Sequence, residues 1–304
     1  MNQKIIIDTD PGHDDAMAIM LAVKSRAFTI MAVTTVCGNS TIENTTRNAR
    51  FILNLLDDDT PVYSGARKPL ARDLIQAVVH GESGLDGINP TNEPLLTNDA
   101  PLRIIELVRQ SPEEITIVTL GPLTNIAAAI ELDPNTMRRV KGIISMAGAF
   151  RVAGNKNAVA EFNVFVDPEA AAIVAASSIP LTFVPLDCCN DIQLPLRSFE
   201  KIRNGVIRQA LLAMNKPYIA NLGKDVGAAA ALMYDVLAMY YLLDPESCEY
   251  EEQFVQIETE GVLTRGMSVI DLRPVPEKIT PNARIVTKID GAKFERCFIE
   301  TLST

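Results

Sequence analysis

The 304-residue sequence contains no tryptophan and only two histidines, and aromatic residues make up 5% of it. Positive charge is also scarce, because 28 lysine and arginine residues stand against 38 aspartate and glutamate residues, which leaves a formal net charge of −10. No basic run is interleaved with aromatic residues, so the electrostatic footprint of a nucleic-acid-binding protein is missing. We therefore expect a partner that is not a polyanion.

The sequence is equally poor in signs of disulfides, zinc sites and membrane segments. Its five cysteines are odd in number and form no CxxC pair, which is typical of reduced thiols in a cytoplasmic protein. The longest uncharged run, residues 170–186, contains a Ser-Ser pair and two prolines, so it predicts a helix followed by a strand and not a membrane span. A strand-like run begins within a few residues of the N-terminus, and we expect no secretory signal.

Short strand-like runs alternate with longer amphipathic runs along the chain. The expected strands are residues 4–8, 29–36, 115–120, 142–146 and 181–186. The expected helices include residues 43–56, 102–110, 123–132 and 168–176. This alternation predicts an open, mainly parallel α/β sheet with helices on both faces.

The C-terminal third has a different pattern. Residues 196–243 predict a mostly helical insertion, and short strand-like pieces at 254–258, 268–271 and 283–288 are expected at the edge of the sheet. No linker rich in glycine and serine interrupts the chain, and 47% of its residues are hydrophobic, enough for a sizeable core. We therefore expect residues 1–304 to form one domain.

Four carboxylates follow the first expected strand within eight residues: Asp8, Asp10, Asp14 and Asp15. Carboxylates packed this closely repel one another unless a cation or a hydroxyl-rich ligand lies between them. Oxygen ligands favour a hard ion, Ca²⁺ or Mg²⁺. Asp14 and Asp15 also fall in the first turn of an expected helix, where the dipole favours anions, so capping is the alternative. Capping leaves Asp8 and Asp10 unexplained at the carboxyl end of a strand, where open α/β sheets bind ligands.

Polar residues or glycines follow the other expected strands as well. Residues 37–39 are Cys-Gly-Asn, residues 121–125 are Gly-Pro-Leu-Thr-Asn, residues 147–148 are Ala-Gly, and Asp187 follows the last of these strands. Each offers a polar side chain or a glycine that lets the backbone approach a ligand. If the strands are parallel, these residues line one polar edge that suits a metal and a hydroxyl-rich ligand.

Three further polar residues, Asn155, Glu161 and Asn163, are spaced among apolar residues. Amide and carboxyl groups suit sugar hydroxyls, because they pair with donors and acceptors, and we expect these three to contact a ligand. The nearby Asp167 has a simpler explanation as the N-cap of a helix whose first residue is Pro168.

Residues 80–87, His-Gly-Glu-Ser-Gly-Leu-Asp-Gly, have the composition of a mobile loop, with three glycines in a polar stretch. The loop carries His80, one of the two histidines. A histidine on such a loop is usually only solvated, so the loop by itself assigns it no function.

Taken in order, these motifs resemble the inosine-uridine preferring nucleoside hydrolases, or nucleoside N-ribohydrolases. The segments that carry the resemblance are residues 8–16 (DTDPGHDDA), 37–39 (CGN), 80–87 (HGESGLDG), 121–125 (GPLTN) and 161–163 (EFN). The resemblance extends from Lys4 to about Asp271. It implies an open α/β fold, a tightly held Ca²⁺ at the carboxyl edge, hydrolysis of ribonucleosides to ribose and free base, and a homodimer or homotetramer.

The resemblance also implies roles for individual residues. The metal would be held by Asp10, Asp15, the backbone carbonyl of Leu120 and Asp235, and Asp10 would also be the general base for the metal-bound water. The ribose hydroxyls would be bound by Asp14, Asn39, Asn155, Glu161 and Asn163, with Met146 beneath the sugar. Phe162 would also belong to the substrate-binding residues. His80 would close over the base and, with Tyr234, would complete the catalytic set.

Elementary chemistry agrees with these implied roles. Departure of the base builds positive charge on the sugar, and a carboxylate-lined, metal-anchored pocket stabilises that charge. The flexible coordination of Ca²⁺ leaves room for two ribose hydroxyls beside protein oxygens, whereas the strict octahedron of Mg²⁺ allows this less easily. Calcium is therefore the expected ion.

Residues 232–236, Leu-Met-Tyr-Asp-Val, depart from the family pattern. Asp235 keeps the metal ligand, but Tyr234 stands where many members carry a histidine that helps to protonate the leaving base. A phenol gives up its proton less readily than an imidazolium, so we expect a weak preference for pyrimidine ribonucleosides. Cys188 and Cys189 also replace residues that are more often small and aliphatic or threonine, and packing is their expected role.

Two other functions stay open at this point. A haloacid-dehalogenase-type phosphotransferase also begins with a strand and Asp-x-Asp, although its pattern requires threonine or valine where this chain has Gly12. A nucleoside- or ribose-binding protein could have kept the sugar contacts and lost turnover because of Tyr234. Phosphate release would favour the first alternative, and tight binding without ribose production would favour the second.

Overall fold

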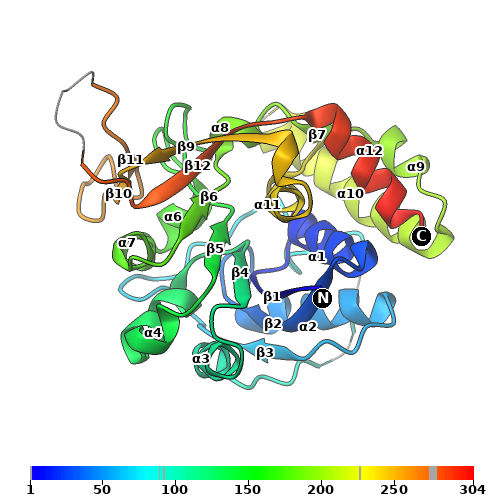
Figure 1. Cartoon of the computed structure of the whole chain (residues 1–304). Coiled ribbons are helices and arrows are strands. Elements are labelled where there is room, and N and C mark those ends of the chain that lie inside the picture. Colours follow the sequence, from blue (N-terminus) through cyan, green and yellow to red (C-terminus); the bar gives the residue numbers. More distant parts are fainter. Residues whose placement is uncertain (1, 89, 92, 226, 274–278) are drawn as a thin grey trace.

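The computed structural model describes residues 2–88, 90–91, 93–225, 227–273 and 279–304 (Figure 1). Within these residues a sheet of eight strands forms the centre, in the order β3-β2-β1-β4-β5-β6-β12-β9. Its strands are β1 (Gln3–Thr9), β2 (Phe28–Thr35), β3 (Val62–Ser64), β4 (Ile115–Thr119), β5 (Gly142–Ser145), β6 (Leu181–Phe183), β9 (Cys248–Gln253) and β12 (Ala283–Ile289). All neighbouring pairs are parallel except β12 and β9, which are antiparallel.

Helices cover both faces of this sheet (Figure 1). One face is covered by α1 (His13–Ser25), α2 (Ile42–Leu55), α10 (Gly205–Asp225), α11 (Tyr234–Leu243) and α12 (Gly291–Leu302). The other is covered by α3 (Ala100–Gln110), α4 (Thr124–Leu132) and α7 (Pro168–Ala176). Successive strand side chains point to opposite faces, so Ile5 and Ile7 enter the first apolar cluster and Ile6 the second. Burial on both faces explains why β1 is a continuous apolar run.

The remaining elements are short. They are α5 (Pro134–Met137), α6 (Phe162–Val166), α8 (Leu186–Cys189), α9 (Leu196–Glu200), the 3₁₀ helix η1 (Pro245–Ser247), and the two-stranded pairs β7 (Gln193–Leu194) with β8 (Ala231–Leu232) and β10 (Gln256–Ile257) with β11 (Ser268–Val269). No helix in the described part of the chain is long and apolar enough to cross a membrane.

The predicted fold class is confirmed, and the five expected inner strands all belong to one parallel array. The expected strand at residues 181–186 is too long, because Pro185 ends the extended segment and Leu186 begins α8. The three-residue strand β3 has no strong sequence signal, and it forms because it pairs with β2.

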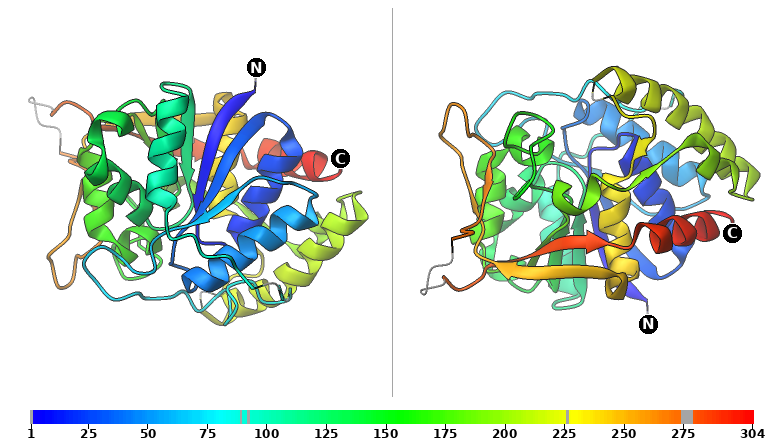
Figure 2. Two further views of the ribbon diagram at one scale, coloured as in Figure 1. Left: turned by 90° about the horizontal axis from the view of Figure 1, so that it is seen from below. Right: turned by 90° about the horizontal axis from the view of Figure 1, so that it is seen from above.

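The predicted sheet edge is only partly right. Strand β9 forms the edge, and β12 lies inside it, between β9 and β6 (Figure 2). The expected strands at 254–258 and 268–271 shorten to β10 and β11, which pair with each other outside the main sheet. Local sequence shows that a segment is extended, but pairing with distant residues decides its place in a sheet.

The predicted segment at 196–243 is confirmed as mostly helical, and part of it is central to the fold. The segment includes β8, and α11 packs beside α1 in the layer that covers the sheet. Asp235 therefore lies in the first turn of a central helix.

The parallel register brings the carboxyl ends of four strands together. Asp8 near the end of β1 pairs with Thr34 of β2 and Thr119 of β4, and Thr119 pairs with Ser145 of β5. The segments that leave these strands therefore meet at one edge, as the sequence predicts.

Candidate active site

The two aspartates at the end of β1 have different surroundings. Asp8 Oδ2 accepts hydrogen bonds from Thr34 Oγ1 (2.6 Å) and Asn125 Nδ2 (2.8 Å), which tie it to the neighbouring strand and to α4. Asp10 Oδ2 accepts one from the backbone N–H of Asn39 (2.6 Å), while its buried Oδ1 has no partner among the described residues. Asp8 Oδ1 is likewise buried without a partner among the described residues. Asp8 is nevertheless held by two side-chain hydrogen bonds, whereas the Asp10 carboxylate accepts one bond, from a backbone N–H.

Two glycines make room for the Asp10 carboxylate. A Cβ added at Gly38 would lie 2.1 Å from Asp10 Oδ2, and one added at Gly121 would lie 2.4 Å from Asp10 Oδ1. Real Cβ atoms do not approach oxygens so closely, so any side chain at either position would displace the carboxylate. The glycines of the 37–39 and 121–125 motifs are therefore required by the position of Asp10.

Asp15 combines two functions at the start of α1. Its Oδ2 accepts hydrogen bonds from the Gly12 backbone N–H (2.9 Å) and from Asn39 Nδ2 (3.1 Å), and its Oδ1 accepts one from Thr9 Oγ1 (2.5 Å). The capping alternative is thus right for part of its role, because it satisfies an N–H at the helix start. The same contacts fix its carboxylate beside Asn39.

Carboxylates from two helices converge at this edge. Oxygens of Asp14, Asp15 and Asp235 lie within 4.8 Å of one another, close enough to hold one metal ion. Burial, and then the neighbouring Asp15 charge, raises the pKa values of Asp10 and Asp14 above the ordinary range. Burial, followed by the charges of Asp14 and Asp15, likewise raises the pKa of Asp235. Without a cation these groups therefore tend to stay protonated.

The donor set fits a hard cation. Asp10 Oδ1 and Asp14 Oδ1 are both buried and have no hydrogen-bond partner among the described residues. Buried polar atoms normally have a partner, and a divalent ion would supply one for both carboxylates. The Leu120 carbonyl, the fourth expected ligand, already accepts a hydrogen bond from Asn163 Nδ2 (2.7 Å) and keeps a second lone pair.

The sugar-binding candidates come from the segment before and within α6. Glu161 is the N-cap of α6, and its carboxylate accepts hydrogen bonds from the N–H groups of Asn163 (2.9 Å), Val164 (3.2 Å) and Gly148 (3.2 Å). Burial raises the Glu161 pKa to about 7. Asn155 Oδ1 accepts from the Phe162 N–H (2.8 Å), which anchors the preceding loop.

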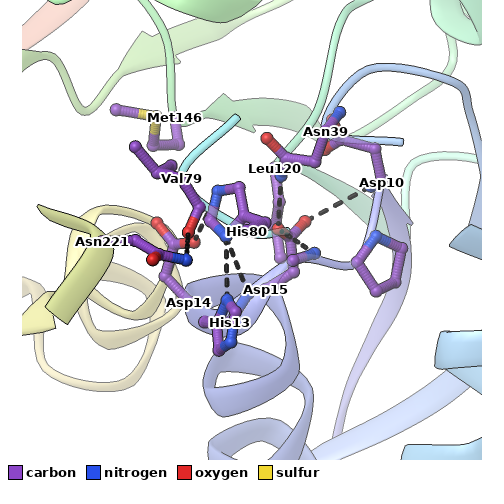
Figure 3. A network of polar contacts seen from close by, with 12 residues as sticks. Asp10, His13, Asp14, Asp15, Asn39, Val79, His80, Leu120, Met146 and Asn221 are labelled. Atoms are coloured by element: carbon purple, nitrogen blue, oxygen red, sulfur yellow. Dashed lines mark hydrogen bonds and ion pairs between the residues drawn. The ribbon is translucent and has the colours of Figure 1, made fainter. Parts of the chain in front are cut away.

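A cavity of about 730 Å³ opens at this edge. Most of the expected site residues line it: Asp14, Asn39, His80, Leu120, Met146, Asn155, Glu161, Phe162, Asn163, Tyr234 and Asp235. Asp10 and Asp15 are fully buried behind it, and both contact the cavity-lining Asn39. The structure thus brings the expected residues to one cavity and its wall. Figure 3 shows six of them together with His80: Asp10, Asp14, Asp15, Asn39, Leu120 and Met146.

His80 is not a solvated loop residue. It is 5% exposed and lines the cavity, with Nε2 4.0 Å from Asp14 Oδ1. Burial lowers its pKa well below the ordinary value, so the ring is neutral. The general tendency of a loop histidine to be solvated does not apply to His80, because the loop folds back over α1 and α10 and brings His80 to the cavity.

Tyr234 is the first residue of α11 and lines the cavity, and its hydroxyl donates a hydrogen bond to Asn190 Oδ1 (2.9 Å). Burial raises the pKa of Tyr234 above its ordinary value, so the phenol is neutral. Cys188 and Cys189 are buried in the apolar cluster with sulfurs 3.8 Å apart, and burial raises the pKa of Cys189. Their surroundings agree with the predicted packing role.

Several residues in or behind the cavity were not among the predicted site residues. Asn190, Gln193, Tyr218 and Leu222 line the cavity, and His13 lies directly behind His80. Asn190 follows the Cys188-Cys189 pair and could have been suspected because it comes after an inner strand. Tyr218 and Leu222 lie in the C-terminal half of α10, where their residue types by themselves predict only burial.

Comparison with known proteins agrees with this geometry. The sequence profile of the inosine-uridine preferring nucleoside hydrolases matches residues 5–296. The pyrimidine-specific ribonucleoside hydrolase RihA of Shewanella sp. strain MR-7 is 39% identical over 311 residues, covering 100% of this chain and 97% of that protein. The plant nucleoside hydrolase PpNRh1 superimposes with a TM-score of 0.91 at 31% identity, covering 100% of both chains. A purine-preferring ribonucleoside hydrolase from Gardnerella vaginalis gives a TM-score of 0.91 at 28% identity, covering 99% of this chain and 98% of that one.

By class, then, the protein is a nucleoside N-ribohydrolase, an enzyme that hydrolyses the N-glycosidic bond of ribonucleosides. The chain belongs to the inosine-uridine preferring nucleoside hydrolase family. Membership in this family excludes the phosphotransferase that the sequence left open. The family uses a metal ion, and the buried acidic cluster is where one fits.

Proposed function

We propose that the enzyme is calcium-dependent, with the ion held by Asp10, Asp15, the Leu120 carbonyl and Asp235. The observation that carries this proposal is the buried acidic edge, where oxygens of Asp14, Asp15 and Asp235 lie within 4.8 Å of one another and Asp10 Oδ1 has no hydrogen-bond partner among the described residues. A bound Ca²⁺ would supply Lewis acidity that lowers the pKa of an attacking water. An all-oxygen donor set with a backbone carbonyl suits its flexible coordination.

Asp10 is the proposed general base. Its Oδ2 is occupied by the Asn39 N–H, so Oδ1 is the oxygen free to accept a proton from water. The glycines at positions 38 and 121 leave no side chain in the way of that carboxylate.

The ribose hydroxyls are bound, in this proposal, by Asp14, Asn39, Asn155, Glu161 and Asn163. Existing hydrogen bonds decide which atom each amide offers. Asn39 and Asn163 donate through Nδ2 to protein oxygens, so each offers Oδ1 as an acceptor. Asn155 accepts through Oδ1 and therefore offers Nδ2 as a donor. Met146 and Phe162 supply apolar contact with the sugar.

Asp14 has a special place in this set. Its Oδ1 has no hydrogen-bond partner in the part of the chain that the structure describes, and its carboxylate lies beside Asp15 and Asp235. A hydroxyl bound by Asp14 would therefore lie next to the metal ligands, so the ion and the carboxylate would orient the same sugar.

We also propose a weak preference for pyrimidine ribonucleosides. The hydroxyl hydrogen of Tyr234 is donated to Asn190, so Tyr234 offers its oxygen and not its proton to a base. Purine departure depends most on protonation of the ring, so it should suffer more than pyrimidine departure, in which carbonyl oxygens spread the charge. The pyrimidine specificity named for the Shewanella relative supports this preference, whereas the purine preference named for the Gardnerella enzyme does not.

The decisive experiment measures metal content and ribose release together. Elemental analysis of the purified protein should find about one Ca²⁺ per chain, and a reducing-sugar assay should detect ribose from uridine and cytidine. Removal of the metal by a chelator should abolish turnover, and Ca²⁺ should restore it better than Mg²⁺. Full turnover by the metal-free protein would contradict the metal proposal. Sedimentation equilibrium would test the homodimer or homotetramer that family resemblance implies.

A further inference from the structure

His13 meets His80 through both its backbone and its ring. The backbone N–H of His13 donates a hydrogen bond to His80 Nδ1 (3.2 Å), and His13 Nδ1 lies 3.0 Å from the same nitrogen (Figure 3). His13 is fully buried at the start of α1, whereas His80 lies on the wall of the cavity. His13 therefore contacts the candidate catalytic histidine from the side that faces away from the substrate.

These contacts determine where His80 carries its proton. A backbone N–H can only donate, so His80 Nδ1 must be the acceptor, and the hydrogen of the neutral ring lies on Nε2. His80 Nε2 is the nitrogen nearest Asp14, at 4.0 Å from Oδ1. The tautomer that the His13 backbone N–H fixes thus presents an N–H donor toward the cavity.

A neutral His13 ring can satisfy only one of its two polar contacts. With the hydrogen on Nδ1, His13 donates to His80 Nδ1, 3.0 Å away. With the hydrogen on Nε2, His13 donates instead to the Asp86 carbonyl, also 3.0 Å away. We assign the hydrogen to Nδ1, and the two variants described below distinguish the two assignments.

Packing holds both rings in this arrangement. Tyr218 of α10 stacks on His13 with ring centroids 4.6 Å apart and an interplanar angle of 4°, and on His80 at 5.3 Å and 17°. A Cβ added at Gly12 would lie 2.7 Å from His80 Nδ1, so the close approach of the two histidines depends on that glycine. Stacking on Tyr218 and the lack of a side chain at Gly12 therefore hold the two rings close together.

We propose that His13 is a positioning residue, which holds His80 with its Nε2–H directed at the leaving base. This inference rests on the proposed role of His80 in assisting base departure. Loss of a hydrogen-bond partner that fixes the tautomer and orientation of a functional histidine typically lowers activity by about 10–100-fold.

Two substitutions of His13 by amide residues distinguish the two polar contacts of its ring. In His13→Asn the amide nitrogen takes the place of Nδ1 and keeps a donor toward His80. In His13→Gln the amide nitrogen takes the place of Nε2, and only the contact with the Asp86 carbonyl is kept. The backbone N–H is present in both variants, so the comparison isolates the side chain.

The test compares two substrates in both variants and in His80→Ala. Uridine needs assistance at its leaving group, whereas p-nitrophenyl β-D-ribofuranoside releases a nitrophenolate that leaves without a proton. In His13→Gln we expect kcat/KM for uridine to fall by about 10–100-fold, mainly through kcat, and to fall at least about tenfold more than for the nitrophenyl riboside. His13→Asn should recover most of the uridine activity, and His80→Ala should show the same substrate dependence as His13→Gln.

Several outcomes would overturn the proposal. Equal losses for the two substrates would mean that His13 only supports the sugar and metal site. Recovery by glutamine and not by asparagine would make the Asp86 contact the important one. Uridine activity that is unaffected in His80→Ala would remove the role on which the inference rests. Failure of the hydrolase assignment is distinguishable, since the wild-type protein would then release no ribose from any nucleoside.

Discussion

Replacement of Asp10 by asparagine should separate activity from stability. Asparagine is nearly isosteric, and its Oδ1 can still accept the Asn39 N–H that Asp10 now accepts at 2.6 Å. The change removes the negative charge and the free carboxylate oxygen, while the packing against Gly38 and Gly121 is preserved. Asp10→Asn therefore tests the chemistry of the carboxylate and leaves the fold intact.

The expected loss of activity follows from the two roles proposed for Asp10. Loss of a general base costs about 10²–10⁴-fold, which corresponds to roughly 2.7–5.4 kcal/mol in activation free energy. Loss of a metal ligand adds to this, so kcat for uridine should fall at least about 10²-fold. The assay is ribose release at saturating uridine with Ca²⁺ present, together with elemental analysis of the protein.

Although Asp10→Asn should lower activity, it should not lower the stability of the metal-free protein. Asp10 is buried among carboxylates, and burial and the charge of Asp15 disfavour its ionised form. Asp10→Asn removes that repulsion, so the metal-free variant should unfold at a temperature no lower than the metal-free wild type. Added Ca²⁺ at about 100 times the dissociation constant should stabilise the wild type by about 2.7 kcal/mol and the variant by less.

Asp8→Asn is the matched control. Asp8 lies in β1, two residues before Asp10, and is equally buried. Its Oδ2 accepts hydrogen bonds from Thr34 and Asn125, and an asparagine oxygen could still accept both. We expect Asp8→Asn to retain activity within about one order of magnitude, well above Asp10→Asn. Equal activities of the two variants, or a fully active Asp10→Asn, would refute the reasoning about Asp10.

Three further predictions concern substrate and pH. Uridine should be cleaved about 10²-fold or more faster than 2′-deoxyuridine, because the polar groups that bind the hydroxyl would be left unpaired, and comparable kcat/KM values would count against the ribose-binding set. The wild type should prefer uridine to inosine in kcat/KM, and Tyr234→His should narrow that difference more than Tyr234→Phe; the idea should be dropped if inosine is already preferred and Tyr234→His leaves the ratio unchanged. Burial raises the pKa values of Asp8 and Glu161 to about 7, so the folded state holds protons that the unfolded state loses from about pH 4. The metal-free protein should therefore lose stability as pH rises from about 5 to 8, and a melting temperature that rises over this range would contradict the assignment.

Features that depend on neighbouring residues could be predicted from the sequence. The alternation of apolar runs predicts the parallel sheet with helices on both faces, and the bounds of β1, β2, β4 and β5 agree with it to within a residue at each end. Asp14 and Asp15 lie in the first turn of α1 as expected, and Asp167 caps α7 ahead of Pro168 as expected. Capping, strand alternation and the glycine requirement act over a few residues, so the local sequence contains the necessary information.

The site residues that come from distant segments required the structure. The family motifs led to Asp235 and Glu161, but no pattern in the chain indicates that Glu161 caps α6 or that Asn163 donates to the Leu120 carbonyl. Asn190 became relevant only when Tyr234 was found to donate to it. Each of these contacts depends on how separate elements pack.

The sequence by itself determined that an acidic, glycine-framed edge follows a buried β-strand, because parallel strands bring their carboxyl ends together. The tertiary structure alone decided how the two histidines are used. His13 and His80 are 67 residues apart, and they meet only because the loop that carries His80 folds between α1 and Tyr218 of α10. Hydrogen-bond direction, tautomer and ring stacking depend on relative positions in space, which residue type and spacing along the chain do not encode.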